Sequence, residues 1–129
     1  MPRQWIGQVD AFVRKELKLQ KKELTIVFLN PGSARKLNRT YRRKNYATDI
    51  LSFEGLTSLE LGELVLCPQV LQRQAREHHH SFKVELAYML IHGVLHLLGY
   101  DHEKSQKEAK RMYRIQDQLF DRLRSKHHI

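Results

Sequence analysis

The chain has 129 residues, of which 41% are apolar and 29% are charged, which suits one domain with a real hydrophobic core. No apolar stretch approaches the ~20 residues that cross a bilayer, and residues 1–5 lack the apolar core of a secretion signal. The single cysteine, Cys67, excludes an internal disulfide, so we expect a cytoplasmic protein. The net charge of +9 favours a nucleic-acid partner over a merely solvated basic surface.

The first half of the chain alternates helical and strand patterns. Apolar residues at helical spacing predict an amphipathic helix over residues 3–18, and the apolar, β-branched residues 24–29 predict a buried strand. A second helix is expected to start in residues 30–33, with Pro at an early position, and to run to about Arg43 with Leu37 and Tyr41 facing inward. The densest basic cluster lies on this helix and directly after it: Arg35, Lys36, Arg39, Arg42, Arg43 and Lys44.

The second half predicts two more strands and three helices. Strands are expected at residues 50–53 and 61–67, and a helix opens at Pro68 and ends in a loop at residues 78–80. Ser81 is the expected N-cap of a helix over residues 82–98, which is apolar on nearly every side and therefore central. A last helix spans about residues 103–124. This pattern predicts one compact α/β domain over residues 1–129, with a small mixed sheet packed with helices around the central helix; strand order cannot be read from the sequence.

Three histidines lie in residues 92–102, inside a stretch that otherwise reads as core. His92 and His96 are one helical turn apart on one face, close enough to hold one ion. Gly99 is the expected left-handed helix stop, after which the chain can turn and bring His102 back over the helix end. Three imidazoles and an open fourth position predict one catalytic zinc ion per chain. The alternative is three unrelated histidines, some of them hydrogen-bonded in the core.

The spacing of these histidines resembles the extended zincin signature H-E-x-x-H-x-x-G-x-x-H, except that Gly93 stands where the general base would be. Asp101 or Glu103 could replace that base, but a residue beside the third ligand is expected to point elsewhere. We assign Asp101 instead to orienting a ligand imidazole. A basic domain with a hydrolytic zinc site and no peptidase base favours phosphodiester substrates, with the developing negative charge stabilised from residues 42–44.

Residues 92–102 also resemble the signature of the YbeY family of bacterial endoribonucleases, H-G-x-L-H-L-x-G-Y-D-H. Residues 37–53 are similar to the family's L-N-x-x-[YF]-R-x-K-D-x-P-T-[DN]-V-L-S-F, and residues 61–66 to its L-G-D-I-x-I strand. Glu108 and Met112 fit its E-x-x-x-M pattern. The departures, none of them a metal ligand, are Asn45, Ala47, Glu54 and Glu63; Asn45 removes one carboxylate near the basic loop.

The resemblance implies a single-domain α/β metalloprotein with zinc on His92, His96 and His102. It implies cytoplasmic cleavage of single-stranded RNA, in 3′-end maturation of 16S rRNA of the small ribosomal subunit and in ribosome quality control. The family's functional arginine corresponds to Arg42, which we expect to be catalytic. The further residues expected to bind RNA are Arg39, Arg43 and Lys44.

Two other functions fit the sequence. One is a zinc hydrolase of another class, a peptidase or amidase, against which Gly93 and the basic charge argue. The other is a non-catalytic RNA-binding module whose metal only braces the fold, against which the open fourth position argues.

Overall fold

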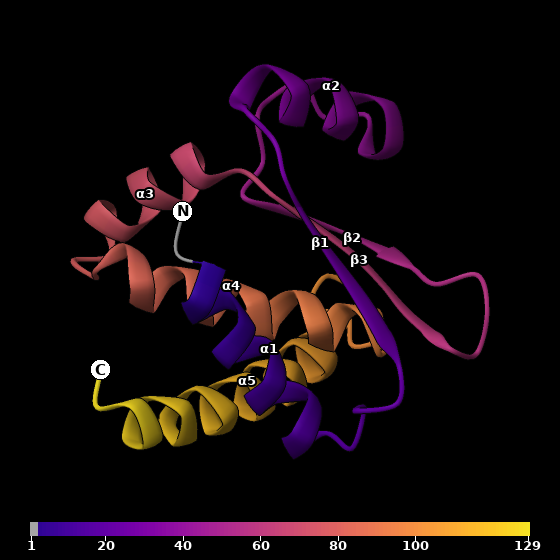
Figure 1. The fold of residues 1–129 in the computed structure, drawn as a ribbon. Helices are drawn as coiled ribbons and strands as arrows, with labels where there is room; N and C mark the ends of the chain where they lie inside the picture. Colours follow the sequence, from indigo (N-terminus) through magenta and orange to yellow (C-terminus); the bar gives the residue numbers. More distant parts are fainter. Residues whose placement is uncertain (1–2) are drawn as a thin grey trace.

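The computed structural model describes residues 3–129, which form one α/β unit (Figure 1). Met1 and Pro2, the start of the predicted domain, lie outside the described residues. The elements follow the predicted order, and their bounds are α1 Arg3–Glu16, β1 Glu23–Phe28, α2 Pro31–Arg42, β2 Ile50–Glu54, β3 Glu60–Leu66, α3 Pro68–Glu77, α4 Phe82–Leu97 and α5 Gln106–His127.

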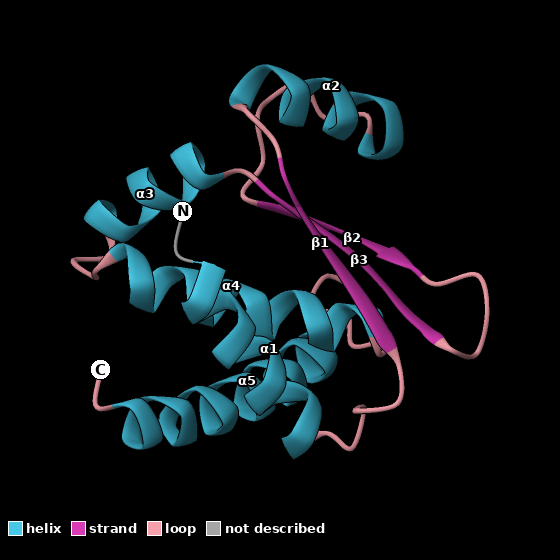
Figure 2. Ribbon diagram, viewed as in Figure 1, coloured by secondary structure: helices cyan, strands magenta, loops and turns pink. Residues whose placement is uncertain are grey.

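The sheet has the strand order β1-β3-β2, with β3 in the middle. β1 runs parallel to β3, and β2 runs antiparallel to it, so the predicted mixed sheet is confirmed. Phe28 and Ile50 both pair with Leu66, so β1 and β3 end where β2 begins. Figure 2 shows α2 at this end of the sheet, apart from the other helices.

α4 is the centre of the domain, as its apolar sequence predicts. It contacts β2 and β3 on one side and α1, α3 and α5 on the others (Figure 2). Its side chains Leu86, Ala87, Ile91 and Leu95 have no solvent exposure. Ser81 caps the helix, accepting a hydrogen bond from the Val84 N–H at 3.2 Å. Because α4 is fixed on all sides, it is a rigid support for the histidines it carries.

The structure corrects the predicted inward face of α2. Tyr41 is 64% exposed and Leu37 is half-buried, whereas Ala34 and Asn38 are the buried residues of this helix. The Asn38 amide donates to the Tyr46 carbonyl oxygen at 2.9 Å. Because α2 packs against a loop at the end of the sheet, its inner positions are small or polar, and the tyrosine is left at the surface.

The last helix begins later than predicted. Ser105 caps it by accepting from the Glu108 N–H at 3.1 Å, so α5 starts at Gln106 and residues 98–105 remain a loop. Within residues 3–129, no helix combines the length and apolar character that a membrane span requires.

Candidate active site

The end of α4 turns the chain back, as Gly99 predicts. Gly99 has φ +96°, its N–H donates to the His96 carbonyl at 3.0 Å, and the Tyr100 N–H donates to the Leu95 carbonyl at 3.1 Å. This pair of bonds is a Schellman motif, which closes a helix and reverses the chain. The following loop therefore carries His102 back toward the last turns of α4.

The three predicted ligands come together. The ring centroids of His92 and His96 are 4.7 Å apart, and the His102 ring is 5.1 Å from each of them. One nitrogen from each ring lies within 4.8 Å of the other two. The three side chains therefore form one cluster, which favours a shared metal site over three unrelated core histidines.

The environment keeps two of these imidazoles neutral. Burial lowers the pKa of His92, outweighing the hydrogen bond to Gln116, and burial together with the neighbouring imidazoles lowers the pKa of His96. Neutral imidazole is the form that binds metal ions.

Gln116, on α5, sets the tautomer of His92. Its side-chain oxygen accepts from the His92 Nδ1–H at 3.0 Å, and its side-chain nitrogen donates to the Tyr88 carbonyl at 3.4 Å. The lone pair of His92 therefore resides on Nε2. On the third ring, His102 Nδ1 is buried without a hydrogen-bond partner among the described residues. Three clustered imidazoles, one of them with a buried nitrogen that has no hydrogen-bond partner among the described residues, fit a zinc ion.

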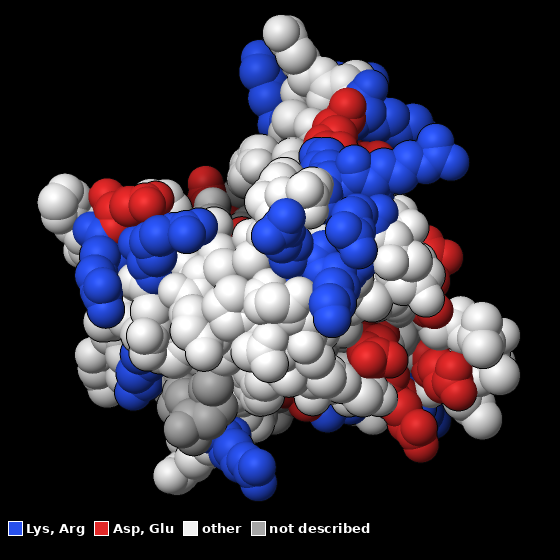
Figure 3. All heavy atoms as spheres, turned by 90° about the horizontal axis from the view of Figure 1, so that it is seen from above, with Lys and Arg blue, Asp and Glu red and all other residues white. Residues whose placement is uncertain are grey.

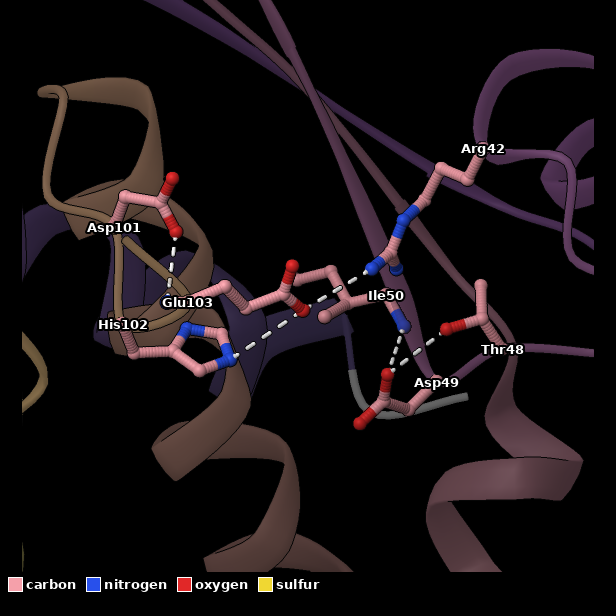
Figure 4. Close-up of polar contacts among 7 residues, drawn as sticks. All are labelled: Arg42, Thr48, Asp49, Ile50, Asp101, His102 and Glu103. Atoms are coloured by element: carbon pink, nitrogen blue, oxygen red, sulfur yellow. Dashed lines mark hydrogen bonds and ion pairs between the residues drawn. The ribbon is translucent and has the colours of Figure 1, made fainter. Parts of the chain in front are cut away.

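Sequence reasoning missed Gln116 and expected Asp101 to orient an imidazole. Asp101 Oδ1 instead accepts from the Glu103 N–H at 2.9 Å, which stabilises the loop before α5 (Figure 4). Its role toward a ligand stays a prediction. Gln116 is a polar residue four positions after Met112 in the apolar stripe of α5, and that is the signal by which it could have been found.

Glu103 lies in the site, contrary to the expectation that it points elsewhere. Its Oε1 is 3.5 Å from Arg42 Nη2 and 3.9 Å from His102 Nε2, so the carboxylate stands between the arginine and the imidazole (Figure 4). Arg42, at the last turn of α2, thus reaches across to the predicted metal ligands. Asp49, also in Figure 4, is engaged by the Ile50 N–H at 2.7 Å and the Thr48 hydroxyl at 3.2 Å.

A long groove joins these groups. The histidine cluster, Arg42, Lys44, Tyr41 and Tyr46 all line it. Arg39 and Arg43 lie just outside its lining, exposed at the end of α2, where Arg43 is the left-handed C-cap. Figure 3 shows Lys and Arg side chains dominating the side of the molecule that α2 occupies.

Comparison with known proteins decides the family. The family model described as Endoribonuclease YbeY matches residues 2–124. The chain belongs to the YbeY family. Its relatives include the Endoribonuclease YbeY of Bdellovibrio bacteriovorus, 51% identical over 97% of this chain and 89% of the relative. The Endoribonuclease YbeY of Staphylococcus carnosus is 37% identical over 92% of this chain and 86% of the relative. This membership confirms the family that residues 92–102 and 37–53 predict, and it places the chain among endoribonucleases.

The YbeY fold is also found among solved structures. The solution structure of a Thermotoga maritima protein superposes with a TM-score of 0.72 at 25% identity, covering 98% of this chain and 86% of that one. The histidine cluster, Arg42 and Glu103 all fall within the residues that the YbeY family model matches.

Proposed function

We propose that the protein is a zinc-dependent endoribonuclease that cuts single-stranded RNA. The observation that carries this proposal is the His92, His96 and His102 cluster, which shares one groove with Arg42 and Lys44 in a YbeY family chain. The relatives are named endoribonucleases, and a net charge of +9 suits a polyanionic substrate.

The histidine cluster would hold the zinc, which when bound supplies a Lewis acid and an activated water near neutral pH. The chain's own contribution is to keep these imidazoles neutral and oriented. Gln116 holds His92 by its Nδ1–H, and the loop after Gly99 holds His102. Because both supports are internal to the fold, the ligands are arranged before substrate arrives.

Arg42 is the group that would stabilise negative charge on the phosphodiester. Its ion pair with Glu103 is partly exposed, and such pairs contribute only about 0–1 kcal/mol. The two non-bridging oxygens of a phosphodiester can therefore replace the carboxylate and accept two parallel N–H hydrogen bonds from the guanidinium. Glu103 would then be released beside His102, where it is near the reacting phosphate.

Two tyrosines supply a basis for preferring single strands. Tyr41 and Tyr46 are 64% and 50% exposed, and both line the groove next to Arg42 and Lys44. Exposed aromatic rings beside cationic groups stack unpaired bases, contributing about 1–3 kcal/mol per base. Paired bases in a duplex cannot reach such rings, so these residues favour flexible RNA.

A peptidase reading is disfavoured by the packing at position 93. A Cβ added to Gly93 would lie 2.7 Å from Ile50 Cδ1 and 2.8 Å from Leu64 Cδ2, so this position faces the sheet. The zincin glutamate has no room there. From the family resemblance we also propose that the protein acts in the maturation of 16S rRNA at the small ribosomal subunit and in ribosome quality control. The same resemblance supports a cytoplasmic location.

The test is cleavage of a labelled single-stranded RNA by the purified chain, before and after chelation and after zinc is restored. We expect cleavage to stop on chelation and return with zinc. Arg42→Glu is expected to lower the rate ~10²–10³-fold, as loss of an oxyanion donor does, while zinc stays bound. Arg42→Lys is expected to recover part of the rate, because lysine keeps the charge but lacks the planar fork.

Arg76→Glu is the matched control, since Arg76 is an exposed arginine of α3 outside the groove lining and its substitution makes the same change in net charge. Equal turnover in the Arg42→Glu and Arg76→Glu variants would show that Arg42 contributes to cleavage no more than any other surface arginine. Undiminished cleavage by the fully zinc-free protein would overturn the zinc requirement.

A further inference from the structure

A second group of metal-binding side chains lies away from the site described so far. His78 and His80, in the connection between α3 and α4, and Glu85, in the first turns of α4, each present a ligand atom within 4.8 Å of the others. They line the same groove as the first histidine cluster. The proposed cleavage reaction uses none of them.

The backbone fixes the two histidines. The His79 N–H donates to the Arg76 carbonyl at 3.2 Å and the His80 N–H to the Ala75 carbonyl at 2.8 Å, which is a second Schellman motif. His79 has φ +58°, a conformation that a residue other than glycine adopts at a cost. Ser81 then caps α4. The connection is therefore held at both ends, which fixes the backbone positions from which His78 and His80 project.

Glu85 is the unusual member of the group. Its side chain is 3% exposed, and a buried carboxylate is costly unless it is paired. His78 Nδ1 lies 2.9 Å from Glu85 Oε1, and His80 Nδ1 lies 3.6 Å from the same oxygen. Both imidazoles thus turn the same nitrogen toward one carboxylate.

The 3.6 Å separation between His80 Nδ1 and Glu85 Oε1 suits a small metal ion as it stands, and the 2.9 Å separation between His78 Nδ1 and Glu85 Oε1 is a hydrogen bond that would lengthen by about 0.4 Å on binding one. Zinc binds imidazole nitrogen and carboxylate oxygen at about 2.0–2.2 Å, which places tetrahedral ligand atoms roughly 3.3–3.6 Å apart. A set of two histidines and one glutamate is also a zinc donor set that leaves further positions open. Because His78 and His80 are exposed while Glu85 is buried, an ion would be held on the groove wall and remain accessible from solvent.

We propose that His78, His80 and Glu85 form a second binding site for zinc or a similar divalent transition-metal ion. Glu85 precedes His92 by seven residues of α4, a rise of about 10 Å, whereas paired catalytic metals lie about 3.5–4 Å apart. The second ion therefore acts independently of the first. Its positive charge would offset Glu77 and Glu85 at this end of the groove.

The competing interpretation is that a proton on His78, and not a metal ion, compensates the negative charge of the buried Glu85 carboxylate. The hydrogen bond to Glu85 raises the pKa of His78, so an imidazolium–carboxylate pair can satisfy the buried charge without any ion. The two interpretations differ in how many metal ions the chain binds, which can be measured without reference to RNA.

The experiment is a count of zinc bound per chain at equilibrium, at neutral pH, for the whole protein and for single-residue variants. We expect two zinc ions in the unsubstituted protein and one in His80→Asn. Glu85→Gln is also expected to bind one, with circular dichroism to confirm that it folds. His92→Asn is expected to lose the other ion and to keep this one.

His79→Asn is the matched control. His79 is the exposed histidine between the two proposed ligands and is not part of the cluster, and asparagine tolerates its left-handed backbone. This variant is expected to keep two zinc ions. A single zinc in the unsubstituted protein that His92→Asn removes, or two in both His80→Asn and Glu85→Gln, would overturn the second site. Loss of RNA cleavage bears on the proposed function alone and leaves this count unaffected.

Discussion

Gln116 shows how one buried amide can prepare a metal ligand. The side chain has no solvent exposure, and it joins His92 on α4 to the backbone of the same helix at Tyr88. Removing it would leave the His92 Nδ1–H without a partner in an apolar setting and would free the ring to rotate. Its energetic contribution is therefore made through His92 rather than by touching a substrate.

We predict that Gln116→Leu lowers zinc affinity at the first histidine cluster about 10–100-fold, the usual cost of losing a residue that orients a ligand. Competition against a zinc chelator of known affinity measures this. Gln118→Leu makes the same change at an exposed position of α5 and should leave the affinity unaltered. Should the two variants bind zinc equally well, Gln116 is only a packing residue.

Tyr88 provides a second residue-level test. Burial, and then the Asp117 carboxylate that accepts its hydroxyl hydrogen at 3.2 Å, raise the pKa of Tyr88 to about 12. Between pH 10 and 12 the unfolded chain has lost this proton and the folded chain has kept it. The contribution of Tyr88 to folding stability is therefore complete below pH 10 and declines as the pH rises toward 12.

We predict that the ultraviolet titration of the folded protein contains a late tyrosinate step that disappears in Tyr88→Phe. The protein in denaturant should titrate all its tyrosines together near the ordinary value of ~10. If Tyr88→Phe leaves the alkaline end of the curve unchanged, Tyr88 does not titrate late.

At the scale of elements, the contact between α4 and the sheet depends on Gly93. A Cβ there meets the side chains of Ile50 and Leu64, and Leu64 is fully buried and cannot move aside. Gly93→Ala is therefore expected to destabilise the fold by about 1–3 kcal/mol through overpacking. The higher helix propensity of alanine offsets ~0.5–1 kcal/mol of this cost.

Thermal unfolding of the metal-free protein tests this expectation. Gly93→Ala should melt several degrees lower, on the order of 3–8 °C. Gly7→Ala is the matched comparison, because Gly7 lies on the exposed face of α1 with nothing within 4 Å of an added Cβ. That variant should melt slightly higher. A higher melting temperature in both variants would mean that the side chains of Ile50 and Leu64 shift to accommodate the added Cβ, and would contradict the overpacking expected at position 93.

The elements themselves were readable because their signals are local. The apolar character of residues 82–97, the Ser81 cap and the glycine after the helix depend on neighbours in sequence, and they predicted α4 and the return of His102. Tyr41 was misplaced because its orientation depends on α2 packing against a loop. Glu103 was misplaced because the ion pair that aims it comes from Arg42, sixty-one residues away in sequence. The strand order depends on long-range pairing that no local pattern records.

At the scale of the whole molecule, charge is segregated by element. The chain carries 23 Lys and Arg against 14 Asp and Glu, and many of the basic residues belong to α2 and the loop after it. Figure 3 shows one group of acidic side chains at the lower right of this face, apart from the basic side chains at its centre, and others beside basic side chains at the left and upper right. A polyanion is therefore attracted to the side of the groove on which Arg42 stands.

This segregation predicts how RNA binding responds to salt. Each phosphate of a single strand that a cation neutralises contributes a slope of about −0.7 to a plot of log K against log salt concentration. With roughly three to five contacts from α2 and its loop, we expect a slope of about −2 to −3.5. Binding of a fluorescent single strand over a salt series measures it.

At matched salt, the same strand annealed to its complement should be cut poorly, because a stiff A-form helix cannot place one phosphate in the groove or stack a base on Tyr41. A slope near zero, or equal cleavage of both forms, would show that the basic surface does not hold flexible RNA, and a substrate of another class would become the better explanation of the site.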